Sequence, residues 1–390
     1  CTDSGGTICK TSDLINEGTI TGNVTNDTGK EINLVENTGT IGGSIANSGS
    51  INTFKVSGTI ANGIINNDNA SISSITINKG ANLGNSGITN NSNIGTFIVN
   101  ESVKYTGNGS DRITQALEVA KDKTLTIQNS GSSNGTLSFN STTNGTINNA
   151  GIIEGNLSNV SNSTLANFTN FGTTSQINGS ITNSGLITYL ENQGTISNSI
   201  TNNANATITN FANSGTINGN INNEGTITSI DNSGVITGEI VSGSSGQTSQ
   251  IDKIINTGTI GTAKTKVATF KTLVASNQDA SSNFNDAISL NTITTTEISN
   301  GGLINGNIRV KGQSDIQELN NTDTIDGCII LEGGRIGNIN NTNGAIANCM
   351  SFSNGANVDN LNNDGTISGT ITNNSGSITI DNSGSISGIT

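Results

Sequence analysis

Histidine, proline and tryptophan are absent from the 390-residue chain, and only 3% of its residues are aromatic. Without histidine the chain lacks the commonest general base and the commonest metal ligand, so neither a Ser-His-Asp nor a Cys-His arrangement is possible. The four cysteines form no Cys-x-x-Cys zinc motif, and no Gly-x-x-x-x-Gly-Lys-Ser/Thr phosphate loop occurs. The sequence therefore predicts a protein that is not an enzyme, with no catalytic residue, no cofactor and no metal.

Charged residues are also scarce. They make up 11% of the chain, the formal net charge is −13, and no basic stripe with interleaved aromatic residues occurs. This composition argues against a nucleic-acid partner. No apolar run is long enough to span a membrane. The absence of proline fits a chain in which nearly every strand is central, because each backbone N–H is then needed for a hydrogen bond between strands.

What the chain has in abundance is a short repeat, Asn-x-Gly-Thr/Ser-Ile, for example at residues 37–41, 213–217, 223–227 and 363–367. Apolar residues alternate between a spacing of four, as in Ile217 and Ile221, and a spacing of three, as in Ile227 and Ile230. The true unit therefore has about 20 residues. Such self-similarity indicates one small unit stacked many times.

The repeat predicts one coil of a parallel β-solenoid. In a strand, a spacing of four places Ile217 and Ile221 on one face, whereas a spacing of three requires a corner between Ile227 and Ile230. Each Asn-x-Gly supplies a further corner, because glycine accepts positive φ and asparagine tolerates it. A coil of two or three short strands pairs its edges only by stacking. We predict an all-β, right-handed parallel β-helix of about 20 residues per coil and roughly eighteen coils, about 85 Å long.

The same pattern assigns side chains to the two faces. Ile217 and Ile221 are expected to face inward, and Thr216, Asn218 and Asn220 to face water. Asparagines at equivalent positions of successive coils can form stacked amide ladders. A hydrophobic fraction of 31% is low for a globular domain of this length, but a solenoid needs only a thin apolar column. Disorder is the alternative for so simple a sequence, and the sustained period of isoleucine argues against it.

No second domain is evident, so residues 1–390 are predicted to form a single β-helix. Two stretches lose the pattern, 101–145, which includes a passage of helix-like composition, and 262–300. They are either degenerate coils with a bulged loop, which we favour, or loops that give a uniform scaffold its binding specificity. The repeat stops in mid-unit at Thr390, and we expect the natural chain to continue beyond it.

The four cysteines fall into two close pairs. Cys1 and Cys9 precede the first clear repeat, and Cys328 and Cys349 are 21 residues apart, which is one full unit. Stacking would hold the Cα atoms of the second pair about 4.8 Å apart, a distance that a disulfide can bridge. We predict the disulfides Cys1–Cys9 and Cys328–Cys349, with free outward thiols as the alternative. Disulfides imply an oxidising, extracytoplasmic location.

The repeated Asn-x-Gly-Thr-Ile units, inward apolar residues, scarce paired cysteines and missing proline resemble the passenger segment of bacterial autotransporters. The resemblance covers essentially the whole chain and rests on repeat style, not on a diagnostic motif. It implies export by type V secretion, exposure at the bacterial cell surface, and anchoring at the outer membrane through a C-terminal barrel outside this segment. Members of that group are commonly adhesins, and some are enzymes or toxins.

The expected function is therefore that of an adhesin or a surface-structural rod. Its partner would be a host-cell or matrix receptor, a glycan, or neighbouring copies of the chain. Two alternatives are a surface-layer or filament scaffold and a polysaccharide-acting β-helix enzyme. The enzyme would need acidic residues clustered on one face, whereas here the acids are expected to be scattered at solvated corners, as at Glu224 and Asp231.

Overall fold

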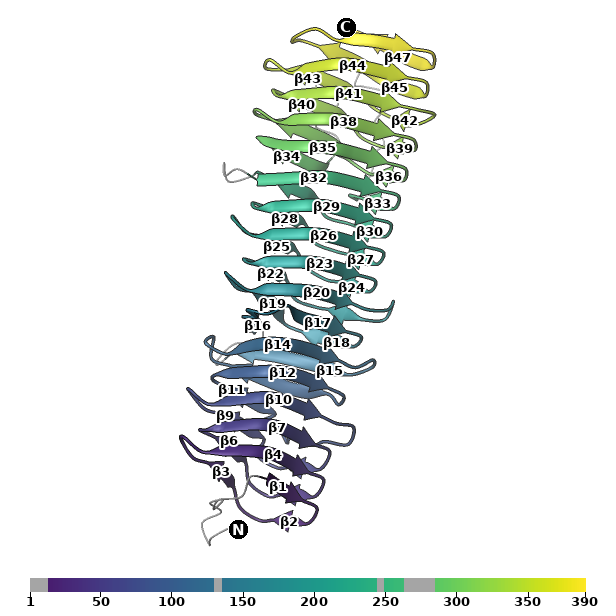
Figure 1. The fold of residues 1–390 in the computed structure, drawn as a ribbon. Coiled ribbons are helices and arrows are strands. Elements are labelled where there is room, and N and C mark those ends of the chain that lie inside the picture. The colour runs from purple at the N-terminus through teal and green to yellow at the C-terminus, as the bar shows by residue number, and fades with distance from the viewer. Residues whose placement is uncertain (1–12, 130–134, 244–248, 263–284) are drawn as a thin grey trace. The chain divides into compact units, whose positions relative to one another are not determined.

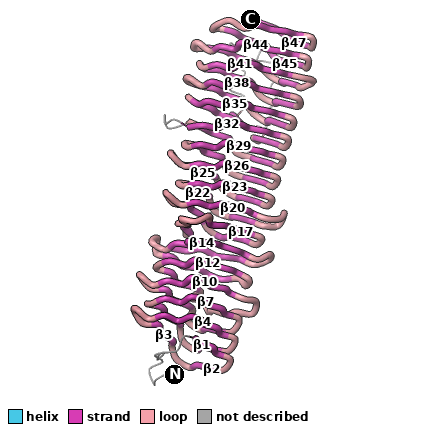
Figure 2. Tube along the Cα trace, viewed as in Figure 1, coloured by secondary structure: helices cyan, strands magenta, loops and turns pink. Residues whose placement is uncertain are grey.

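The computed structural model describes residues 13–129, 135–243, 249–262 and 285–390. These residues are all-β, with no helix, and form a parallel β-solenoid of about 16 turns with roughly 21 residues per turn (Figures 1 and 2). The predicted fold class is thus confirmed. The chain divides into two compact units, Cys1–Ser197 (unit 1) and Asn198–Thr390 (unit 2). Within each unit the coils wind in the right-handed sense (Figure 1).

Each regular coil has three sides. In unit 2 a long strand, β26 (Thr207–Asn213), is followed by the two-residue β27 (Thr216–Ile217) and the three-residue β28 (Ile221–Asn223). Each strand pairs in parallel with its equivalent in the next coil, β26 with β29 (Thr226–Asn232) and β28 with β31 (Ile240–Ser242). The sequence left two or three sides open, and the structure has three.

The strands are grouped below by the side of the coil that they form. In unit 1 the long side consists of β1 (Asp13–Asn16), β4 (Glu31–Asn37), β7 (Ser50–Val56), β10 (Ser71–Ile77), β12 (Asn93–Val99), β14 (Arg112–Val119), β17 (Gly145–Asn149), β20 (Thr164–Asn170) and β23 (Leu186–Asn192). The second side consists of β2 (Thr19–Ile20), β5 (Thr40–Ile41), β8 (Thr59–Ile60), β18 (Ile152–Glu154), β21 (Gln176–Ile177) and β24 (Thr195–Ile196). The third side consists of β3 (Val24–Asn26), β6 (Ile45–Asn47), β9 (Ile64–Asn66), β11 (Ile88–Asn90), β16 (Thr136–Phe139), β19 (Asn156–Asn159) and β22 (Ile181–Asn183), and both β13 (Val103–Gly107) and β15 (Thr124–Asn129) extend over the second and third sides.

Unit 2 repeats this arrangement. Its further long strands are β32 (Ser249–Asn256), β35 (Ile293–Asn300), β38 (Asp315–Asn321), β41 (Arg335–Asn341), β44 (Asn357–Asn363) and β46 (Thr379–Asn382). The second side continues with β30 (Val235–Ile236), β33 (Thr259–Ile260), β36 (Leu303–Ile304), β39 (Thr324–Ile325), β42 (Ala345–Ile346) and β47 (Ser385–Ile389). The third side has β25 (Ile200–Asn202), β34 (Asp286–Asn291), β37 (Asn307–Lys311), β40 (Ile329–Glu332) and β43 (Met350–Ser353), and β45 (Thr366–Asn373) runs over the second and third sides.

The core is a column of inward apolar side chains. Ile217 and Ile221 are fully buried, as predicted, while Asn218 is exposed and Thr216 and Asn220 are half-buried. Asn220 is half-buried because its Oδ1 accepts a hydrogen bond from the backbone N–H of Glu239 at 3.0 Å. It therefore serves as a bridge to the next coil and not only as a solvated corner.

The two apolar spacings have different roles from those predicted. Ile217 and Ile221 lie on separate strands, β27 and β28, so the turn lies within the spacing of four. Ile227 and Ile230 lie on one long strand, β29, where the inward–outward alternation slips by one residue between them. The prediction of a straight strand between Ile217 and Ile221 was wrong because three intervening residues, including Gly219, are enough to change direction.

Residues 101–145 form degenerate coils where the structure describes them. The passage of helix-like composition is strand β14, which pairs in parallel with β12. Between Ile113 and Ala116 it carries one residue more than the facing step from Ile94 to Thr96, which is a β-bulge. Of the second irregular stretch, residues 263–284 lie outside the described residues, while β35 pairs in regular register with β38 and β34 pairs with β37 with one register irregularity between Asp286 and Ile288.

Asparagines form the predicted amide ladders along two corners of the coil. We call the residues that end the long strands column A and those that end the third side column B. In unit 2, column A is an unbroken run in which each Nδ2 donates to Oδ1 of the next coil at 2.7–2.8 Å: Asn213, Asn232, Asn256, Asn300, Asn321, Asn341, Asn363 and Asn382. Because all of these amides except that of Asn382 are buried, the ladder satisfies groups that would otherwise be costly to remove from water.

Column B of unit 1 is interrupted, and its asparagines return at Asn159 and Asn183. The first run of asparagines ends at Asn90, whose Nδ2 donates to the hydroxyl of Tyr105 at 2.8 Å. That hydroxyl donates to Oδ2 of Asp111 at 2.7 Å, and both residues are fully buried. Gly107 occupies the column position itself, where a Cβ atom would lie 2.4 Å from the Asp111 carboxylate. Burial and the neighbouring Asp111 carboxylate raise the pKa of Tyr105 well above its usual value.

Candidate functional site

The long side of unit 2 carries a polar groove of about 620 Å³ on its outward face. It lies over β35, β38, β41 and β44, and it contains no apolar or aromatic side chain. Its lining residues are Thr296, Glu297, Asp315, Gln317, Glu318, Arg335, Gly337, Asn338, Asp359 and Asn360. The groove is the candidate functional site.

The groove follows from the slip in the long strands. On β38 both Gln317 and Glu318 are exposed, because two successive residues face outward there. On the next strand the position level with Gln317 is Gly337, which is buried and has no side chain to fill the space. A Cβ atom there would lie 2.6 Å from the backbone oxygen of Gln317, so a side chain would force the strands apart. Gly337 thus forms the floor between longer polar neighbours.

Arg335 crosses the groove between two carboxylates. Its Nη1 lies 3.1 Å from Oδ1 of Asp315, and its Nη2 donates to Oδ2 of Asp359. The hydrogen bond that Arg335 donates to Asp359, followed by the one that it donates to Asp315, raises the pKa of Arg335 above its ordinary value. Asp359 is itself held by Nδ2 of Asn357 at 2.6 Å. The guanidinium therefore links three successive coils.

Two glutamates face each other on neighbouring strands. Glu297 of β35 is the register partner of Glu318 of β38. Nδ2 of Asn320 donates to Glu297 at 3.2 Å and to Glu318 at 3.3 Å, and Nζ of Lys253 lies 3.2 Å from Glu297. Within the described ranges no ion pair reaches Glu318. Like charges directly opposite each other in a sheet repel, so this pair is unfavourable as it stands.

Outward amide ladders border the groove. Nδ2 of Asn340 donates to Oδ1 of Asn320, and Nδ2 of Asn362 donates to Oδ1 of Asn340, each at 2.8 Å. Within the groove, Asn360 donates to Asn338 at 3.0 Å. These ladders fix the rotamers of the rim, so the groove is preorganised and a ligand would lose little free energy in ordering it.

The expectation that the acids are scattered is wrong for this face. Stacking brings Glu297, Asp315, Glu318 and Asp359 into one groove, although Glu224 and Asp231 do lie apart from it. The signal that could have found the cluster is the register, since Glu297 and Glu318 are one repeat unit apart. Even so, the described residues contain no group of three or more carboxylate, histidine or cysteine side chains that could hold a metal ion.

A second charged network lies on the third side of unit 2. Nε of Arg309 lies 2.8 Å from Asp286, and its Nη1 lies 2.6 Å from Glu332. Glu239 is close by, and its burial, followed by the charge of Asp286, raises its pKa. The arginine side chain is only 16% exposed, so this network links coils and offers little surface to a ligand.

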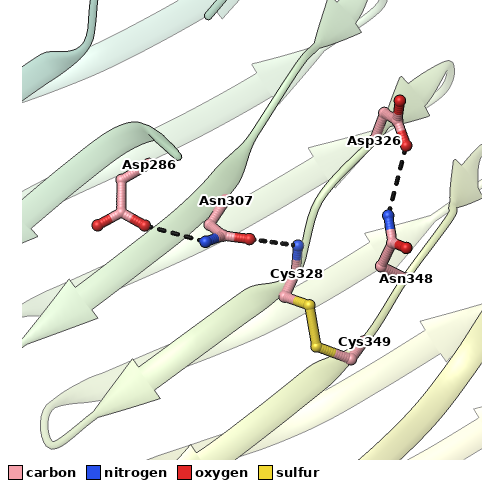
Figure 3. The surroundings of a disulfide bond; sticks show 6 residues. All are labelled: Asp286, Asn307, Asp326, Cys328, Asn348 and Cys349. Atoms are coloured by element: carbon pink, nitrogen blue, oxygen red, sulfur yellow. Dashed lines mark hydrogen bonds between the residues drawn. A yellow bond between two sulfur atoms is a disulfide. The ribbon is translucent and has the colours of Figure 1, made fainter. Parts of the chain in front are cut away.

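The structure contains one of the two disulfides that the sequence predicts (Figure 3). Cys328 and Cys349 are bonded, with Cα atoms 4.5 Å apart. The backbone N–H of Cys328 donates to Oδ1 of Asn307 at 2.9 Å, and Nδ2 of Asn307 donates to Asp286 at 3.1 Å. The bond ties together the two coils that carry Asp315 and Arg335. Cys1 and Cys9 lie outside the described residues, so their pairing stays a prediction.

Comparison with protein-family models, with curated proteins and with solved structures gave no match. Among the residues that the structure describes, none belongs to a helix long and apolar enough to cross a membrane. The groove and the fold that positions it are therefore the observations on which a function is proposed.

Proposed function

We propose that this chain is a non-enzymatic surface protein that binds a partner through the groove on the long side of unit 2. In biological terms it is an adhesin of the autotransporter-passenger type, exposed outside the bacterial cell. The groove carries the proposal, because it is a concave, rigid surface on a repetitive scaffold and no apolar or aromatic side chain lines it. Binding residues are commonly displayed in this way on rigid frameworks.

The chemistry of the groove supports binding more than catalysis. Its one cationic side chain, Arg335, already bonds Asp315 and Asp359. Its amides are tied to one another, as in the bond from Asn360 to Asn338. Such groups recognise a partner by hydrogen bonding and charge. The disulfide between Cys328 and Cys349 supports the extracytoplasmic location, because such bonds persist in oxidising compartments.

The test is a solid-phase adhesion assay with the purified chain on cultured cells and on extracellular-matrix proteins. Asn338→Trp would fill the groove with a bulky ring, and Ser74→Trp makes the same change at the equivalent outward position of β10 in unit 1. We expect binding by the wild type and the Ser74 variant and a loss of at least severalfold for the Asn338 variant. Absence of wild-type adhesion, or equal loss in both variants, would contradict the proposal.

One observation favours a second function, a polysaccharide-acting enzyme. Glu297 and Glu318 are carboxylates on adjacent strands, and glycoside hydrolysis commonly uses such a pair. The check is release of reducing ends from a panel of polysaccharides. Hydrolysis by the wild type that is abolished in Glu318→Gln would establish the enzyme, whereas no hydrolysis together with adhesion supports the binding protein.

A further inference from the structure

We infer that the groove receives the lysine or arginine side chains of a basic polypeptide segment. This inference rests on the proposed function, since it names the partner of the same site. Four carboxylates line the groove, and Arg335 is the one cationic lining residue. Because the guanidinium is already bonded to Asp315 and Asp359, it has no charge left to offset the other two.

The remaining pair, Glu297 and Glu318, is the place in the groove where a ligand cation would gain most. Neighbouring strands lie about 4.8 Å apart, so the two carboxylates are held close by the fold itself. Only the neutral amide of Asn320 donates to both, and Lys253 reaches Glu297 alone. An ammonium or guanidinium group placed against the pair would relieve the repulsion and donate hydrogen bonds to the free carboxylate oxygens.

The shape and chemistry of the groove favour a basic peptide over other cations and over sugars. A metal ion needs converging ligands, and the described residues hold no such group of three. Sugar rings are usually held partly by apolar or aromatic surfaces, and none lines the groove. A side-chain ammonium needs only two or three acceptors, which the glutamate pair and Asn338 supply. The net charge of −13 would also draw a basic segment toward the chain.

The experiment measures binding of a fluorescein-labelled oligolysine peptide to the full chain by fluorescence anisotropy, at low and at physiological salt. Glu318→Gln removes the unpaired charge, and Glu118→Gln makes the same change on the exposed face of β14 in unit 1. We expect oligolysine binding that weakens with salt and that falls about two- to fivefold in Glu318→Gln, the effect of one solvent-exposed ion pair. Glu118→Gln should bind like the wild type.

Three results would overturn the inference: no binding of oligolysine, equal weakening in both variants, or binding of a neutral oligosaccharide that Glu318→Gln leaves unchanged. Competition in the adhesion assay separates this inference from the proposed function. Adhesion that excess oligolysine fails to displace refutes the basic partner and leaves the adhesin standing. Oligolysine binding without adhesion to any surface refutes the adhesin and supports the cation-binding groove.

Discussion

Parts of the two units build the same corners from opposite kinds of side chain, amides in one unit and apolar groups in the other. In unit 1, column A becomes apolar through four successive coils while column B is made of asparagines: Val56, Ile77, Val99 and Val119 in column A, and Asn26, Asn47, Asn66 and Asn90 in column B. In unit 2, column A is the unbroken asparagine run, and column B becomes apolar at Leu290, Val310, Leu331 and Phe352.

This reversal shows that the type of side chain is matched between neighbouring coils along a column. It is not fixed by the position within the repeat. A buried amide is stable when the coils next to it present a partner, and a buried valine is stable when its neighbours are apolar. Amides within a ladder also donate to backbone carbonyls, and where a ladder stops the last amide keeps only these backbone acceptors. Nδ2 of Asn37, for example, lies next to Val56 and donates to the carbonyl oxygens of Gly39 and Thr59 at 3.3 and 3.1 Å.

The outward faces of the long strands differ in the same columnar way. Strand β10 of unit 1 presents four hydroxyl side chains, Ser71, Ser73, Ser74 and Thr76. The corresponding positions of β38 in unit 2 hold Asp315, Gln317, Glu318 and Asn320. Two of the three inward positions are apolar in both strands, Ile72 and Ile75 in β10 and Ile316 and Leu319 in β38, so the outward side chains can differ without a change in the fold. The core sets the coil, and the outward columns are free to carry charge.

The largest expected loss of stability comes from placing a charge in the apolar core. Both units have such a core, so this test does not distinguish them. Ile217→Asp in unit 2 places a carboxylate in the apolar column and should cost several kcal/mol through desolvation. Thr216→Asp, on the neighbouring outward position, should cost less than about 1 kcal/mol. Limited proteolysis should cut the first variant near residues 210–230 and leave distant coils protected, because each coil contacts only its neighbours. Equal damage by both changes would contradict the assignment of faces.

We test whether side chains must match along a column by exchanging asparagine and valine in column A of each unit. Asn300→Val deprives Asn256 of an acceptor and Asn321 of a donor, at a cost of about 2–4 kcal/mol. Val99→Asn places a lone amide between Ile77 and Val119, which should cost about 1–3 kcal/mol.

Urea unfolding measures both exchanges, with Asn362→Val on the exposed face of β44 as the control that changes stability by less than about 1 kcal/mol. If Val99→Asn were neutral, a single amide could satisfy itself without a ladder, and side chains would not need to match along a column.

A third test concerns the end of the first asparagine run in column B of unit 1. Tyr105→Phe removes the hydroxyl between Asn90 and Asp111 and should cost about 2–3 kcal/mol, because a buried carboxylate then loses a donor. Tyr189, which is half-buried on the outward side of β23, provides the matched control, and Tyr189→Phe should cost less. In an alkaline ultraviolet titration, Tyr105 should ionise only as the chain unfolds, because its pKa lies well above the usual value. Equal costs for the two variants would show that the terminal bonds contribute nothing.

A smaller change, an increase in stability, is expected from a substitution on β35. Thr295 is fully buried at a position level with Ile316, and its hydroxyl has no hydrogen-bond partner. Thr295→Val keeps the shape and removes the unsatisfied group, so it should raise the free energy of unfolding by about 1 kcal/mol. Thr294→Val, one residue earlier and exposed, should change it by less than about 0.5 kcal/mol. A destabilised Thr295→Val in urea unfolding would point to a partner for that hydroxyl.

The smallest effect is a difference in acid response between the units. In unit 1, the ion pair with Lys123 and the backbone N–H groups of Gly80 and Ser102 lower the pKa of Glu101 to about 2. Its stabilisation is present above the unfolded value of 4.5 and is lost as the pH falls toward 2. In unit 2, burial raises the pKa of Glu239, so protonation there favours the folded state as the pH falls.

Carboxyl-detected NMR titration should therefore show Glu101 titrating below 4.5 and Glu239 above it. The variants Glu101→Gln and Glu239→Gln assign the two signals. Coincident titrations would remove this contrast between the units.

The sequence predicts the solenoid well because the same signal is repeated many times. The spacing of Ile217 and Ile221 identifies inward residues, and recurring asparagines indicate ladders. The number of turns, about 16 against roughly eighteen expected, is lower because some coils are longer than the repeat: Asn66 and Asn90 are 24 residues apart, and Asn256 and Asn300 are 44 apart.

The groove and the end of the ladder were harder to foresee, because both depend on register between coils. Glu297 and Glu318 read as isolated acids until one repeat is laid on the next. Tyr105 and Asp111 lie in a stretch where the repeat is degenerate, so nothing in the local pattern marks them as partners. The register between coils results from many weak pairings. A single sequence predicts it only where the repeat is regular.

The direction of the buried amide ladder in column B of unit 1 gives this corner an electrical polarity. Every Nδ2 in column B of unit 1, from Asn26 to Asn90, points toward the following coil. Aligned amide dipoles add, as they do in an α-helix, and leave partial positive charge at the donor end. The carboxyl group of Asp111 lies at that end, joined through the hydroxyl of Tyr105. A β-structure has thus acquired, from its side chains, the counterpart of a helix N-terminus with its anion bound.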